Sequence, residues 1–343
     1  MEIECITAKN AVESASLKAK AKKLEADNLQ MKNENSKLRS FITVQKEKLE
    51  NIPLVSLDDF EKSVVIGSGA TSMVTKVLKK QREEFAMKEL KLYDHTSFKN
   101  FLRESEILFK LRHPCIVRIY GFNYGDSTHA PSIYLSLEPK NLEQAIKNRE
   151  LSDDQKNRII VEIILGMRYM HEKKLMHRDL KPANILLSKN NHVRISDFGL
   201  AKEEDLETTQ TCGVGSLLFM APERFSEDYH SEVDVYAFGI ILIFIMTNCY
   251  PKYDHMKAFQ NIPPQLPSTM CSWVVELIQQ CLAARPESRP KFKDIFEIMK
   301  EHNFDVFNDT KSTTLTKQQQ KGKEEIEHRI LKIEAFEYQH STE

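Results

Sequence analysis

Two short polar stretches in this 343-residue chain carry side chains suited to phosphoryl chemistry. Residues 175–187 place Asp179, Lys181 and Asn184 in an otherwise apolar frame, and residues 193–199 add Asp197. Carboxylate and amide oxygens suit Mg²⁺, which binds few protein groups and takes phosphate and water for the rest. A carboxylate beside a lysine near such a metal fits phosphoryl transfer, because one group orients a hydroxyl while cations absorb the developing charge.

Two features upstream fit a phosphate-binding cleft. Gly67 and Gly69 follow an apolar run at 63–66, which indicates a strand, a tight turn and a return strand, although an ordinary hairpin shares this pattern. Lys88 stands in the apolar stretch 84–90, and Glu104 follows on a segment with an apolar helical face. A Lys88–Glu104 pair would hold the ammonium against an anionic ligand. The alternative is an edge-strand lysine that reaches water.

In this order and spacing, the motifs resemble the catalytic domain of eukaryotic protein kinases, over about residues 60–302. The resemblance implies an α+β, bilobal fold, with a small antiparallel β-sheet lobe that holds one helix (60–138) and a large, mainly helical lobe (141–302). ATP would lie in the cleft between the lobes. The resemblance also implies a protein serine/threonine kinase (EC 2.7.11.-) that uses ATP and Mg²⁺ to phosphorylate protein substrates.

The resemblance assigns a role to each catalytic residue. Asp179 is expected to be the base that faces the acceptor hydroxyl, and Lys181 to steady the γ-phosphate. Lys88, held by Glu104, would bind the α- and β-phosphates.

The same resemblance places the nucleotide and its metal. Asn184 and Asp197 are the expected metal ligands. The expected ATP-binding residues are Ile66, Gly67, Ser68, Gly69, Ala70, Thr71, Ser72, Met73, Val74, Ala86, Lys88, Leu137, Glu138, Lys140 and Leu186.

The chain departs from the family pattern at two positions. Ser72 replaces the third glycine of the phosphate loop, and Ser216 stands where serine/threonine kinases usually have threonine. Either hydroxyl at 216 can bridge Asp179 and Lys181, and the sequence at 181–184 favours serine or threonine acceptors. Stretches such as 114–117 look like tyrosine kinases, so the chain resembles the tyrosine-kinase-like group of serine/threonine kinases.

Regulation by phosphorylation is expected on the activation segment. Arg178 and Lys202 would pair with a phosphate there, which carries about two negative charges. The candidate acceptors are Thr208, Thr209 and Thr211. The alternative is that these threonines are polar loop residues without a regulatory role.

Residues 1–52 predict a coiled coil that forms a parallel dimer, joined to the catalytic region by a linker at 53–59. Leu17, Leu24, Met31 and Leu38 recur every seven residues, and Asn28 at a core position favours parallel, in-register strands. The charged flanking positions between 13 and 39 pair with opposite sign, which supports a homodimer through residues 13–52. A lone solvated helix is the alternative, and a different partner chain is not excluded.

The remaining composition favours a cytoplasmic protein with no nucleic-acid or membrane partner. Formal net charge is −1, which gives no electrostatic case for nucleic acid. The longest apolar stretch, 237–246, is about half of what a bilayer crossing needs, the N-terminus lacks a signal-peptide pattern, and the six cysteines form no CxxC pair. The polar tail at 303–343 is expected to be disordered or to form a helix at 321–338.

A binding protein without catalysis is the alternative class of function. A kinase-like scaffold, or pseudokinase, would bind partners without catalysis and would be expected to have lost Lys88, Asp179, Asn184 or Asp197, all of which are present. A structural coiled-coil protein would account for residues 1–52 only.

Overall fold

The computed structural model describes most of the region from residue 52 onward. The predicted coiled-coil seam lies almost wholly outside the described residues, as do Ala70, Thr208, Thr209, Thr211 and Ser216. The described residues are 20, 22–23, 52–69, 71–79, 83–91, 95–125, 129–199, 201–203, 217–225, 229–252, 257, 260, 262, 264–308 and 315–340.

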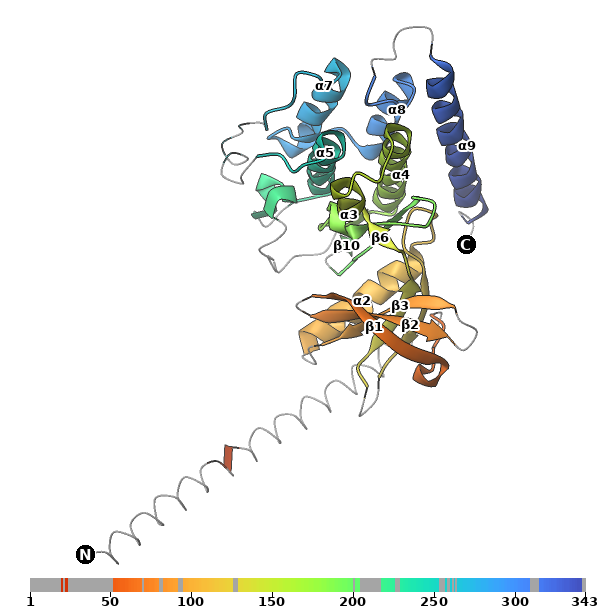
Figure 1. Cartoon of the computed structure of the whole chain (residues 1–343). Coiled ribbons are helices and arrows are strands. Elements are labelled where there is room, and N and C mark those ends of the chain that lie inside the picture. Colours follow the sequence, from red (N-terminus) through yellow and green to blue (C-terminus); the bar gives the residue numbers. More distant parts are fainter. Residues whose placement is uncertain are drawn as a thin grey trace, which may run out of the picture.

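The small lobe is a five-stranded antiparallel sheet with one helix packed on it, α2 (His95–Lys110), as Figure 1 shows. The central strand β3 is buried from Phe85 to Leu90, so solvent reaches only its first residue. Phe98, Phe101 and Leu102 recur at helical spacing and are buried, which turns the apolar face of α2 toward the sheet. In order β1-β2-β3-β5-β4 the strands are Phe60–Ser68, Ser72–Lys79, Glu84–Leu90, Ser132–Ser136 and Ile119–Asn123.

The large lobe is mainly helical and surrounds α5 (Glu232–Thr247), which is buried over most of its length and shows no polar stripe. The expected α+β bilobal fold is confirmed. Among the described residues, no helix is both long and apolar enough to cross a bilayer. The other helices are α3 (Leu142–Lys147), α4 (Asp153–Glu172), α7 (Ser272–Cys281), α8 (Phe292–Glu301) and α9 (Lys317–Gln339).

Short elements in the large lobe hold the loops that carry the polar motifs. A two-stranded sheet pairs β7 with β10, and a three-stranded sheet has the order β6-β8-β9. The strands are β6 (Lys140–Asn141), β7 (Leu175–Met176), β8 (Ile185–Leu187), β9 (Val193–Ile195) and β10 (Lys202–Glu203). The 3₁₀ turns are η2 (Leu57–Asp59), η3 (Pro182–Asn184), η4 (Leu217–Phe219), η5 (Pro222–Phe225) and η6 (Pro286–Ser288).

The segment 53–59, expected as a linker, docks on the outer edge of β4. The Val55 amide donates to the Phe122 carbonyl (3.0 Å), and the Phe122 amide donates to the carbonyl of residue 53 (2.9 Å). A Cβ at Gly121 would lie 1.9 Å from Val55 Cγ2, so only glycine leaves room for this side chain. Ile52, at the end of the expected coiled coil, is 3% exposed and belongs to the hydrophobic core. The small lobe therefore includes residues from Ile52 onward.

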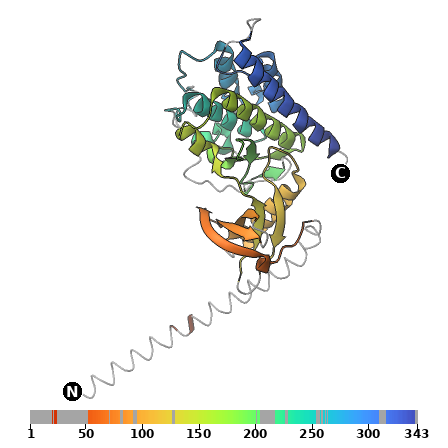
Figure 2. The ribbon, with the colours of Figure 1, turned by 45° about the vertical axis from the view of Figure 1, so that its right-hand side comes forward.

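The helix α9 lies alongside α4 on the large lobe (Figure 2). It starts earlier than the segment 321–338, because the Thr316 hydroxyl and Gln319 form a reciprocal capping box at its N-terminus. Ile326, Ile330 and Ile333 are buried at helical spacing on one face. This apolar stripe packs α9 onto the lobe.

A buried carboxylate on α4 binds a side chain of α9 and so fixes the position of α9 along α4. Glu162, in the middle of α4, is fully buried and accepts from Arg329 Nε (2.5 Å), the Val193 amide (2.6 Å) and His192 Nδ1 (2.7 Å). Burial alone would raise the pKa of Glu162, but His192 and Arg329 together hold it below its usual value. The carboxylate therefore stays charged and depends on α9 for one of its partners.

Arg329→Gln should destabilise the fold, because it leaves a buried charge with one cation fewer. We expect the free energy of unfolding at neutral pH to fall by about 2–4 kcal/mol, measured by urea denaturation. Since the pKa of Glu162 is lowered by folding, its stabilisation is present above the ordinary carboxyl value of 4.5 and is lost as the pH falls through the folded pKa. The difference between variant and wild type should therefore shrink in acid.

Lys332→Gln is the matched control, since Lys332 is exposed on the same helix and should change stability by less than about 0.5 kcal/mol. Equal effects of the two substitutions would show that Arg329 does not stabilise the buried carboxylate.

Candidate active site

Lys88 joins groups from three separate elements. It lies on β3 opposite Val74 of β2 and Ile133 of β5, in the middle of the sheet. Its Nζ lies 2.5 Å from Glu104 Oε1 on α2 and 3.0 Å from Asp197 Oδ1 on the loop after β9. Burial would lower the pKa of Lys88, but these two carboxylates more than offset it and raise the pKa above its usual value. Lys88 is therefore a fixed cation held between the lobes.

Asp197 turns its carboxylate toward Lys88 through an unusual backbone conformation. Its φ is +65°, in the left-handed region that non-glycine residues adopt at a cost of about 1 kcal/mol or more. The next residue, Phe198, is buried, and its ring centroid lies 5.1 Å from that of His177. The charge of Lys88 holds the pKa of Asp197 below its usual value, and 48% of the Asp197 side chain stays exposed. The carboxylate is thus ionised and open to a ligand.

The loop 177–184, which follows β7 and is called the catalytic loop below, brings Asp179, Lys181 and Asn184 into direct contact. Lys181 Nζ lies 2.6 Å from Asp179 Oδ2, and the Asn184 side-chain amide donates to the same oxygen (3.0 Å) and to the Asp179 carbonyl (2.8 Å). The carbonyl of Asn184 accepts from both the amide and the hydroxyl of Ser196 (2.9 Å each). The turn η3 therefore holds the three predicted side chains together and fastens them to the loop that carries Asp197.

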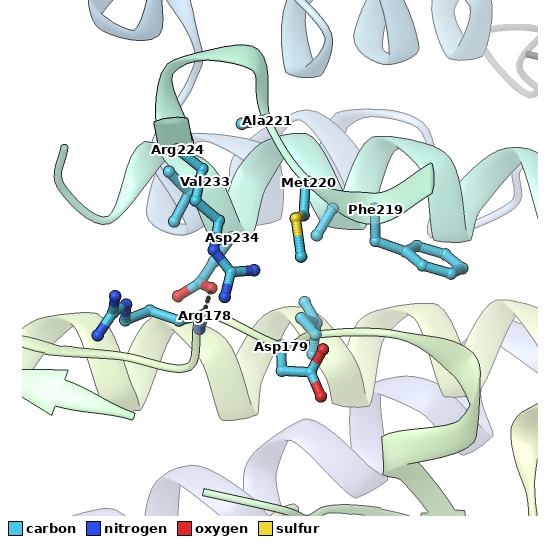
Figure 3. Close-up of a pocket in the computed structure, with 10 residues that line it drawn as sticks. Arg178, Asp179, Phe219, Met220, Ala221, Arg224, Val233 and Asp234 are labelled. Atoms are coloured by element: carbon cyan, nitrogen blue, oxygen red, sulfur yellow. Dashed lines mark hydrogen bonds between the residues drawn. The ribbon is translucent and has the colours of Figure 1, made fainter. Parts of the chain in front are cut away.

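A single buried carboxylate holds the backbone at the start of this loop through hydrogen bonds. Asp234, at the start of α5, is 1% exposed and accepts from the amides of His177 and Arg178 (2.8 Å each) and from His171 Nε2 (2.9 Å). Burial would raise the pKa of Asp234, yet the His171 hydrogen bond and charge hold it below its usual value. Figure 3 shows Asp234 with Arg178 and Asp179 around a cavity of about 10 Å³, large enough for one water at most.

The glycine loop forms a closed turn between β1 and β2. The Gly69 amide donates to the Ser72 carbonyl (2.9 Å), and the loop residues Ile66, Gly67, Ser68, Thr71, Ser72, Met73 and Val74 flank or form that turn. A Cβ at Gly67 or Gly69 would meet no atom closer than 3.6 Å. Packing within the described chain therefore does not demand glycine there, whereas a phosphate group close to the backbone would.

Lys91 binds this loop through three hydrogen bonds. The sequence did not predict this role. Its Nζ donates to Ser68 Oγ (2.5 Å) and to the Gly69 carbonyl (2.9 Å), and its amide donates to the Thr71 carbonyl (2.8 Å). An exposed lysine just past a strand resembles any surface lysine in sequence, so no signal marks it. Its place at the end of β3, beside the turn, becomes visible only through the pairing of β2 with β3.

The residues expected around the adenine lie where the two lobes meet. Ala86 is buried on β3, and Val74 and Leu137 pack against the same core. Leu186 lies on β8 opposite position 141.

Glu138 and Lys140, two of the expected ATP-binding residues, have side-chain partners of their own. Lys140 Nζ is 2.5 Å from Glu150, and the carboxylate of Glu138 lies 3.8 Å from Arg194 Nε.

The predicted regulatory cations are partly described. The guanidinium of Arg178 lies 5.1 Å from the centre of the Tyr229 ring and donates to the Tyr229 hydroxyl. Burial and the nearby charge of Arg224 lower the pKa of Arg178 to about 10. Lys202 pairs with Met176 through the β10–β7 ladder.

The described residues fit ATP with magnesium. They contain no group of three or more Asp, Glu, His or Cys side chains that could hold a metal by themselves. Asn184 and Asp197 offer oxygens, and Mg²⁺ is commonly held by one or two protein groups together with the phosphates of its nucleotide. Lys88 and Lys181 add the positive charge that a triphosphate needs.

Comparisons with known proteins identify similar sequences. A family model described as "Protein kinase domain" matches residues 60–304. A probable serine/threonine-protein kinase of Dictyostelium discoideum is 30% identical over 264 residues, 72% of this chain and 28% of that protein. An Aurora kinase of Debaryomyces hansenii is 32% identical over 261 residues, 70% of this chain and 62% of that protein.

A third relative, the serine/threonine-protein kinase AtPK1/AtPK6 of Arabidopsis thaliana, is 36% identical over 250 residues, 69% of this chain and 53% of that protein. The match with this chain thus spans between 28% and 62% of the length of these three relatives.

Lys91→Met should loosen the glycine loop and weaken nucleotide affinity. We expect the Kd for ATP with Mg²⁺, measured by calorimetry, to rise about fivefold, the effect of losing one or two exposed hydrogen bonds from a charged donor. Lys79→Met, at the exposed end of β2, is the matched control and should leave the Kd unchanged. If the two variants bind ATP equally well, Lys91 does not order the loop for the nucleotide.

Proposed function

We propose that this chain, which belongs to the protein kinase family, transfers the γ-phosphate of ATP to serine or threonine hydroxyls of protein substrates. The observation that carries the proposal is Lys88, held by Glu104 and in contact with Asp197. Three elements from two lobes must be positioned together for this contact, which places a cation and a potential metal ligand beside each other. The serine/threonine relatives support the choice of acceptor.

Each polar residue then has one task in the transfer. Bound ATP would supply the phosphoryl group, and bound Mg²⁺ would supply positive charge that neutralises its phosphate oxygens. Asp179 Oδ2 is shared by Lys181 and Asn184, which leaves Oδ1 to orient the acceptor hydroxyl and take its proton. The new bond joins the hydroxyl oxygen to the γ-phosphorus while the bond to the bridging oxygen of ADP breaks. Lys181 lies beside this point and stabilises the negative charge that develops.

A kinase-like scaffold remains the alternative function. It would keep the fold and the interlobe contact without catalysis, so the two proposals differ only in turnover. The direct Asp179–Lys181–Asn184 contact favours the enzyme, because a scaffold has no need for a carboxylate, an ammonium and an amide to converge.

Asp179→Asn should abolish turnover without disturbing the fold, since the two side chains have the same size. We expect phosphate incorporation from radiolabelled ATP into a generic protein substrate to fall by about 10²- to 10⁴-fold, the usual contribution of a general base. Asp153→Asn, which changes an exposed aspartate at the start of α4, is the matched control and should keep full activity. Equal incorporation by wild type and Asp179→Asn would show that Asp179 is not the base, and incorporation by wild type no higher than background would favour the scaffold.

We further propose that residues 13–52 form a parallel homodimer that raises the local concentration of catalytic domains and promotes phosphorylation of Thr208, Thr209 or Thr211 in trans. The heptad pattern and charge pairing of the sequence support the dimer. Arg178 and Arg224 line the same small cavity, which supports a role for their charges in binding a phosphate of this region.

Deleting residues 1–50 tests the dimer, and it spares Ile52 and Val55, which belong to the small lobe. At low enzyme concentration the shortened chain should incorporate at least about tenfold less phosphate at the three threonines, measured by mass spectrometry, because encounters become bimolecular. High enzyme concentration should restore the modification. Unchanged phosphorylation at low concentration would sink the proposal.

A further inference from the structure

A cavity of about 550 Å³ lies away from the nucleotide cleft, where α2 ends, β4 begins and α9 ends. None of the residues that line it is among those expected to bind ATP, metal or the acceptor hydroxyl. One wall comes from α9, through Phe336 and His340, and α9 lies beyond the matched region 60–304. The cavity is therefore a feature that the kinase match does not account for.

The lining is cationic. Arg112, Arg118 and Arg194 contribute guanidinium groups, and two histidines also line the cavity, whereas none of its lining residues is Asp or Glu. Two carboxylates that contact lining residues already have partners, because Glu337 binds Arg168 (3.1 Å) and the ring of His113, whose pKa is lowered by burial, and Glu138 faces Arg194. A concave surface lined by one sign of charge concentrates ions of the other sign.

The remaining lining is apolar and aromatic. Leu108 and Ile116 are buried and line its apolar part. The Phe336 ring stacks on His340 with centroids 4.0 Å apart, and the Arg118 guanidinium lies 5.2 Å from the centre of the Tyr120 ring. Guanidinium groups and aromatic rings at the same wall suit a ligand that is both anionic and apolar.

We propose that this cavity binds a small organic anion with an apolar body of aromatic size and one carboxylate, sulfonate or phosphate group. The volume falls within the usual range for small-molecule sites, about 300–1,000 Å³, which favours a compact ligand over an extended peptide. The apolar body would contact Leu108, Ile116 and Phe336, and the anionic group would face Arg112 and Arg118. The proposal concerns binding alone and does not depend on phosphoryl transfer.

The test uses two fluorescent probes of similar shape and different charge. The sulfonate 8-anilinonaphthalene-1-sulfonate and the neutral N-phenyl-1-naphthylamine are titrated into the full chain, with saturating ADP and Mg²⁺ to keep them out of the nucleotide cleft. The double variant Arg112→Gln, Arg118→Gln removes two exposed charges. We expect its affinity for the sulfonate to fall about tenfold, as for the loss of two exposed ion pairs, with affinity for the neutral probe unchanged.

Arg285→Gln is the matched control, since it removes the same charge from an exposed position outside the cavity and should leave both probes bound as in wild type. The neutral probe also reports whether the cavity survives in each variant. Equal sulfonate affinity in the double variant and in Arg285→Gln would overturn the proposal. Parallel loss of both probes would overturn it as well, because the arginines would then act on the shape of the cavity and not on the anion.

Discussion

The site depends on one ammonium group shared by two carboxylates. Lys88 is buried in the sheet of the small lobe, and a buried cation is unfavourable unless opposite charges surround it. Glu104 supplies one from α2 and Asp197 supplies the other from the large lobe. Any movement of α2 or of the loop after β9 would leave a charge without its partner, so the contact links the relative position of the lobes to the electrostatics of the cleft.

The large lobe meets this demand with a rigid frame of backbone hydrogen bonds. Asp234 accepts from two consecutive amides at the start of the loop that carries Asp179, and Ser196 ties that loop to the one bearing Asp197. Arg178 and Asp197 both have positive φ, a conformation that persists only where the surroundings hold it in place. The strain falls beside the reacting groups, and the buried helix α5 provides the support beneath it.

The bilobal fold was predicted through the resemblance of the ordered motifs to the kinase family, and the contact of Asp179, Lys181 and Asn184 could be predicted because the three residues stand in one short loop. The sequence did not predict Lys91, whose partners are backbone atoms of a turn. It also did not show that Gly121 makes room for Val55, since that fit depends on which segment lies against the edge of β4. The isoleucines of α9 indicated an apolar face, and Glu162, within the otherwise apolar stretch 159–167 of α4, was an overlooked sign that this stretch has a polar partner.

The packing of α9 on α4 has a consequence for where this domain ends. The family match stops at residue 304, yet Arg329, which lies beyond it, binds the carboxylate of Glu162, and Ile326, Ile330 and Ile333 cover an apolar surface of the large lobe. A fragment that ends at that boundary would expose this apolar surface to solvent and would leave Glu162 without Arg329. Exposed apolar patches of this kind favour self-association. The packed structure of this chain therefore continues past residue 304, where the family match ends.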